Sequence, residues 1–165
     1  MQVYMNLRLV ATIALGITSA LVLTYCGAIN VFPVSEDQRL GAQFDKEIKA
    51  DAKQYPPYVN ANAQQYVQRI IDKIIQSPDV KYRGKFSYKV QLIKDDAMIN
   101  AFCTPGGYIY VYTGLLKAID NEATLAGVLG HEIAHAEQRH STDRMTTQLG
   151  IQTMMDIALG NNKNQ

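Results

Sequence analysis

The chain has 165 residues, of which 47% are hydrophobic and 19% are charged. This is the composition of a globular protein, and the length allows one domain. With 16 basic and 15 acidic residues the formal net charge is +1, and no basic run stands out, so nucleic-acid binding is not expected. The two cysteines, Cys26 and Cys103, are too few for a disulfide scaffold.

The first 26 residues indicate export from the cytoplasm. Arg8 precedes an apolar segment over residues 9–23. Its length is typical of a secretory signal, with a one-pass membrane anchor as the alternative. Cys26 resembles the cysteine that is acylated in bacterial lipoproteins, although Tyr25 stands where such signals have a small residue. We expect residues 1–26 to be a signal peptide, with Cys26 as a candidate for lipidation, and we expect a location in the periplasm or cell envelope.

Two amphipathic helices are predicted first in the remaining chain. Ser35 and Gln38 have the spacing of a capping box. Apolar residues then follow at every fourth position, namely Leu40, Phe44 and Ile48. A second helix is predicted over about residues 59–76. Its apolar stripe comprises Ala63, Tyr66, Val67, Ile70, Ile71 and Ile74.

The hydrophobic period then changes to that of strands. Apolar and polar residues alternate over residues 86–92, which predicts a strand with one buried face. Further along we expect a loop over residues 95–107, a strand over 108–112, a helical turn over 114–119 and a long helix over 120–140. Asp120 is the expected N-cap of that helix, which could continue past His140. This order of elements indicates an α+β fold.

A zinc-binding motif, HExxH, occupies residues 131–135 of the long helix. His131 and His135 lie one turn apart on the same helix face, where two imidazoles can share one tetrahedral Zn²⁺ ion. Glu132 lies about 100° round the helix from His131. It is within reach of a zinc-bound water, whose proton it can accept during attack on a peptide carbonyl. The alternative is a pair of surface histidines, but the apolar residues 125–130 favour a site in a cleft.

Several segments around the motif form a recognisable pattern. They are Asn100-Ala101-Phe102, Pro105-Gly106-Gly107-Tyr108-Ile109, Thr113-Gly114-Leu115-Leu116, Glu122, residues 125–135 and Arg139-His140. Together they resemble peptidase family M48, the zinc metalloendopeptidase family of HtpX, the CAAX prenyl endopeptidase and BepA. The resemblance implies a zincin-like metallopeptidase domain over residues 27–165, with a small sheet packed on the long motif helix and one Zn²⁺ per chain.

The resemblance also implies a gluzincin metal site, in which two motif histidines and a glutamate from a later helix hold the ion. Residues 141–165 contain no glutamate. Among nearer residues, Glu137 points away from the motif face and His140 stands one position short of the metzincin spacing. Asp143 and Asp156 reach the metal only if the chain folds back. We therefore expect the C-terminal part of the domain to be missing and zinc binding by this chain to be weak.

Substrate contacts are expected from the segment before the long helix. Tyr108, Tyr110 and Tyr112 share one face of a strand. They either form an aromatic wall beside the cleft, on an edge strand that pairs with the substrate, or pack on the motif helix. Gly106 and Gly107 make a tight turn and are candidates to shape the cleft.

Two functions follow from these features. The first is a zinc metalloendopeptidase with Glu132 as general base, which hydrolyses peptide bonds in exported or misfolded envelope proteins as part of protein quality control. The second is a truncated, non-catalytic relative that binds peptides or partner proteins because the third zinc ligand is missing. Attachment to the membrane through lipid or an N-terminal anchor is a candidate in both cases, and the oligomeric state is not predicted. Cys103 is expected to be a buried small apolar residue.

Overall fold

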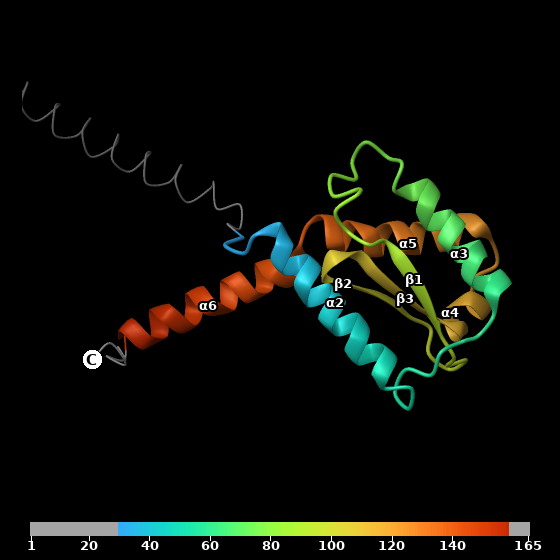
Figure 1. The fold of residues 1–165 in the computed structure, drawn as a ribbon, viewed down its shortest axis with the longest axis horizontal. Coiled ribbons are helices and arrows are strands. Elements are labelled where there is room, and N and C mark those ends of the chain that lie inside the picture. The colour runs from blue at the N-terminus through green and yellow to red at the C-terminus, as the bar shows by residue number, and fades with distance from the viewer. Residues whose placement is uncertain (1–29, 159–165) are drawn as a thin grey trace, which may run out of the picture.

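The structure, a computed structural model, describes residues 30–158, so the expected signal segment 1–26 with Cys26 lies outside the described residues. Its elements are α2 (Val34–Ala50), α3 (Ala61–Ile74), β1 (Lys89–Ile93), β2 (Ala101–Thr104), the 3-10 turn η1 (Pro105–Gly107), β3 (Tyr108–Tyr112), α4 (Thr113–Ala118), α5 (Glu122–Glu137) and α6 (His140–Ala158). Helices around one small sheet confirm the expected α+β class (Figure 1). Across residues 30–158, no helix has both the length and the hydropathy needed to cross a bilayer.

The three strands form one sheet in the order β1-β3-β2, with β1 parallel and β2 antiparallel to β3. The prediction of a loop over residues 95–107 is therefore wrong for residues 101–104, which form β2. That strand is four residues long and too short to show an alternation of its own. It pairs with β3 because Gly106 and Gly107, with φ angles of 72° and 83°, turn the chain back through a conformation that favours glycine.

Both faces of the sheet are buried, because its central strand β3 is apolar on both sides. Ile109 and Val111 belong to the main core together with residues of α3 and α5, whereas Tyr110 packs in a second cluster with Ile48 of α2. Figure 1 shows α2 on the opposite side of the sheet from α5. The buried residues of α5 include Leu129, which is 0% exposed. The buried residues of α5 therefore determine which face of this helix remains outside the core and is available for a functional site.

Asparagine side chains cap α3 and α5. Asn60 accepts a hydrogen bond from the N–H of Ala63 at 3.0 Å, and Asn121 accepts one from the N–H of Thr124 at 2.9 Å. Each bond satisfies a backbone donor that has no partner within the helix. The expected cap Asp120 is therefore one position too early.

The first helix, α2, begins differently from the prediction. It has no side-chain cap, so the capping box expected from Ser35 and Gln38 does not form. A close approach to the η1 turn positions this helix instead. A Cβ atom added at Gly41 would lie 2.0 Å from the carbonyl oxygen of Pro105, so only glycine allows this packing.

A buried ion pair lies where the motif helix ends. The sequence allowed this helix to continue past His140, but α5 stops at Glu137 and Arg139 adopts a left-handed φ of 54°. The Arg139 Nε donates to the Asp37 carboxylate at 2.8 Å, and the Thr142 hydroxyl donates to the same carboxylate at 3.0 Å. Asp37 is 1% exposed. This network ties the start of α2 to the junction of α5 and α6, and so determines where His140 lies.

Candidate metal centre

The motif histidines project from the side of α5 that the core leaves free. His131 is exposed and His135 is half-buried. Their Nε2 atoms are 3.0 Å apart. Two imidazole nitrogens bound to one tetrahedral zinc ion stand about 3.3 Å apart, given the usual zinc–nitrogen distance. The two rings are therefore placed to share one ion with little rearrangement.

A third imidazole, that of His140, lies behind His135. The Nδ1 atoms of the two rings are 2.6 Å apart, while Nε2 of His135 faces His131. If Nδ1 of His135 carries the proton and donates it to His140, Nε2 keeps the lone pair that a metal requires. Burial, together with the neighbouring His131 and His140, lowers the pKa of His135. The neutral form of a metal ligand is thus favoured at neutral pH.

Glu132 lies beside the edge strand β2. The carboxylate of Glu132 is half-buried. Burial raises the pKa of Glu132, and the nearby His131 and the Cys103 N–H act in the opposite direction. Burial also raises the pKa of the half-buried Cys103 thiol, so the thiol stays protonated at neutral pH. A half-buried carboxylate near the His131 imidazole is a candidate general base.

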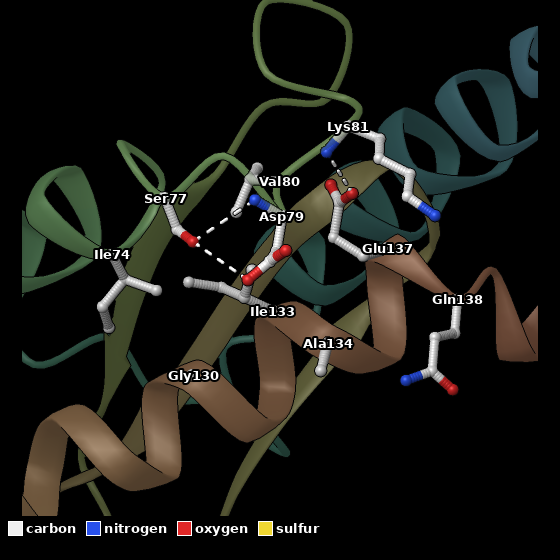
Figure 2. Close-up of a pocket in the computed structure, with 10 residues that line it drawn as sticks. All are labelled: Ile74, Ser77, Asp79, Val80, Lys81, Gly130, Ile133, Ala134, Glu137 and Gln138. Carbon is white, nitrogen blue, oxygen red and sulfur yellow. Dashed lines mark hydrogen bonds between the residues drawn. The ribbon is translucent and has the colours of Figure 1, made fainter.

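Glu137 lies on a different face of α5 from the motif histidines, as its position along the helix predicted. Its carboxylate accepts hydrogen bonds from the N–H of Lys81 at 2.6 Å and from the hydroxyl of Tyr88. Figure 2 shows the contact with Lys81 at a cavity of about 380 Å³ between α5 and residues 77–81. None of the motif side chains of His131, Glu132 and His135 lines this cavity, so it is separate from the candidate metal centre.

The sequence profile of Peptidase family M48 matches residues 61–163, more than half of the chain. The chain belongs to peptidase family M48. Mitochondrial metalloendopeptidase OMA1 of Schizosaccharomyces pombe is 27% identical over 147 residues, which cover 81% of this chain and 42% of that protein. The beta-barrel assembly-enhancing protease of Yersinia pestis is 29% identical over 116 residues, covering 70% and 22%. OMA1 of Arabidopsis thaliana is 43% identical over 58 residues, covering 35% and 12%.

Membership of the M48 family supports a protease by resemblance, and M48 peptidases generally depend on zinc. The chain spans less than half the length of each of these relatives. Within the described residues, no group of three or more His, Cys, Asp and Glu side chains is arranged to hold a metal ion. His131 and His135 therefore fit two ligand positions of an M48 zinc site, and the described part of the chain supplies no third. The side chain of Asp156 lies outside that part.

The tyrosine-rich strand of this M48 chain is placed differently from the prediction. β3 is the central strand, so its backbone is paired on both sides and is not the expected edge for a substrate. Tyr110 is 1% exposed, and its hydroxyl donates to the Asp45 carboxylate of α2 at 2.9 Å. Tyr108 and Tyr112 pack in the same cluster as Tyr110, on the side of α2. The alternative that these tyrosines pack on the motif helix is therefore wrong.

The sheet edge nearest the motif belongs to β2. The carbonyl of Asn100 accepts a hydrogen bond from the N–H of Tyr112 in β3. Because antiparallel pairing alternates, the N–H and C=O groups of Ala101 and Cys103 point away from β3. The Cys103 N–H on this outer edge is also one of the groups that lower the pKa of Glu132. Sequence reasoning missed β2 as a strand, although Asn100-Ala101-Phe102 belonged to the family pattern and the paired glycines that follow mark the turn into β3.

Proposed function

We propose that the protein is a zinc-dependent endopeptidase that cleaves exported or misfolded proteins of the cell envelope. The observation that carries this proposal is the 3.0 Å separation of the Nε2 atoms of His131 and His135. The half-buried Glu132 carboxylate, near enough to His131 for the two to interact electrostatically, supports the proposal as the candidate base. Zinc, when bound, supplies a Lewis acid that polarises the peptide carbonyl.

Each of the chain's own residues has one task in this proposal. His131 and His135 bind the ion through Nε2, and His140 holds His135 in the tautomer that leaves Nε2 free. Glu132 accepts the proton of the attacking water and can pass it to the leaving amine. The outer edge of β2 orients the substrate, because an extended peptide can pair with the backbone groups that point away from β3.

The location in the cell envelope is part of the proposal. The apolar residues 9–23 support it, and one of the relatives is named for beta-barrel assembly. We propose residues 1–26 as a signal or anchor, with lipid at Cys26, and residues 27–165 as the peptidase domain. Mass spectrometry of the envelope fraction tests this part of the proposal. Loss of residues 1–25 with a lipid mass on Cys26 supports it, whereas an intact Met1 with a free Cys26 thiol contradicts it.

A second candidate function is that of a non-catalytic relative that binds peptides. It is favoured by the finding that the described residues hold no group of three or more His, Cys, Asp and Glu side chains arranged for a metal ion. Isothermal titration with Zn²⁺, combined with a casein cleavage assay, separates the two candidates. The peptidase predicts stoichiometric zinc binding and cleavage that a chelator stops and zinc restores. The binding relative predicts weak zinc binding, and peptide binding without cleavage.

A further inference from the structure

A groove of about 410 Å³ lies between α2, the edge strand β2 and the first turn of α6. On the side of α2 and the loop after it, the groove is lined by Phe44, Glu47, Ile48, Asp51 and Tyr55. On the other side it is lined by Cys103, Thr104, Pro105 and Ser141. These last four residues also line a small cavity together with His135. The groove therefore adjoins the candidate metal centre.

The groove combines negative charge with aromatic and aliphatic surface. Glu47 and Asp51 are exposed and lie one helical turn apart, and Phe44 is 39% exposed. None of the described residues that line the groove is Lys or Arg. Lys49, which also belongs to α2, is paired with Asp45 at 2.6 Å. Glu47 accepts a hydrogen bond from the Gln43 amide at 2.9 Å, and Asp51 accepts one from the N–H of Gln54 at 2.9 Å. Each carboxylate has further acceptor sites, which a cation from outside can use.

A long basic side chain matches this combination. Its methylene stem can pack on Phe44 and Ile48, as lysine and arginine stems do on apolar surfaces. Its cation can then reach the carboxylates of Glu47 and Asp51 and lie near an aromatic ring. An acidic side chain would instead meet two like charges, which disfavours its binding.

A substrate peptide that pairs with β2 would place such a side chain at the groove. Cys103 pairs with Ile109 of the main core, whereas Phe102 pairs with Tyr110, which packs on the side of α2. A peptide paired with β2 presents alternate side chains to these two faces of the sheet. Every second side chain of the peptide therefore lies on the side of the groove, and its neighbours lie on the side of α5.

We propose that this groove is a specificity site for a lysine or arginine side chain of an extended protein substrate, selected by Glu47 and Asp51. The proposal rests on the peptidase function proposed above, and it deepens that function by naming a substrate class. The natural substrates are then proteins with exposed, extended segments that carry basic residues.

Fluorescence anisotropy with labelled peptides tests the groove in the presence of a chelator, so that turnover plays no part. The probes are short fluorescein-labelled peptides of Thr and Val with one central Lys, or with Glu in its place. We expect the lysine peptide to bind about tenfold more tightly, which corresponds to about 1.4 kcal/mol. The double variant Glu47→Gln, Asp51→Asn should abolish the difference. The matched control Glu36→Gln, which changes an α2 carboxylate outside the groove, should preserve it.

Three outcomes would overturn the proposal. They are equal affinity for the two peptides, no binding of either peptide, and a lysine preference that survives the double variant. Casein cleavage with zinc tests the peptidase function separately. Cleavage without a lysine preference rejects the groove and keeps the peptidase, whereas a lysine preference without cleavage supports the groove as a peptide site and contradicts the peptidase.

Discussion

The substitution Asp37→Asn tests the ion pair that joins α2 to the end of the motif helix. The Asp37 carboxylate is 1% exposed and accepts hydrogen bonds from Arg139 at 2.8 Å and from Thr142 at 3.0 Å. The side chain of Arg139 is itself only 12% exposed. The variant keeps the shape of the side chain but leaves a nearly buried guanidinium without its counter-charge.

Removing one partner of a buried ion pair lowers the free energy of unfolding by about 3–5 kcal/mol. A domain of this size has a total of about 5–15 kcal/mol, so the variant loses a large part of its stability. Urea unfolding followed by circular dichroism measures the loss. The matched control is Glu36→Gln, which breaks the exposed pair with Arg39 and should change stability little, because surface pairs contribute little. A loss for Asp37→Asn as small as that of the control would refute the reasoning.

Two further predictions concern the core and the pH dependence of stability. Leu129→Ala, at a position that is 0% exposed, should lower the free energy of unfolding by about 2–5 kcal/mol in urea titrations, whereas Val59→Ala, at 92% exposed, should be almost neutral. Hydrogen bonds from Lys117, Lys94 and Thr113 hold the pKa of Asp96 below its ordinary value. Its stabilisation is therefore present at neutral pH and lost on acidification. Thermal melts of Asp96→Asn and wild type should differ at pH 7 and converge in acid, and a difference independent of pH contradicts this.

The elements with strong periodicity could be predicted from the sequence. The helix α3, the strand β3 and the motif helix α5 lie within or close to the ranges predicted for them. The apolar stripe of α3 encodes the face that this helix buries, and the aromatic and β-branched run of β3 suits a strand buried on both faces. β2 could not be predicted in the same way, since its four residues become a strand only by pairing with β3. The same pairing makes β3 the central strand, and no local pattern reports which strand forms an edge.

In the candidate site too, local features could be predicted from the sequence and contacts between distant residues could not. The spacing of His131 and His135 implies their shared face, because helix geometry alone determines it. The contact of His140 with His135 depends on the left-handed turn at Arg139. The side chain that holds this turn is Asp37, which lies 102 residues earlier in the chain. A contact that depends on such a distant residue leaves no sign in the local sequence.

The variant Glu132→Gln tests the central claim most directly. It removes the proposed base and keeps both imidazoles, so zinc binding measured by isothermal titration should match the wild type. Casein cleavage in the presence of zinc should fall by about a hundredfold or more. The control Glu122→Gln, an exposed glutamate at the start of the same helix, should change neither quantity. Undiminished cleavage by Glu132→Gln would contradict the account.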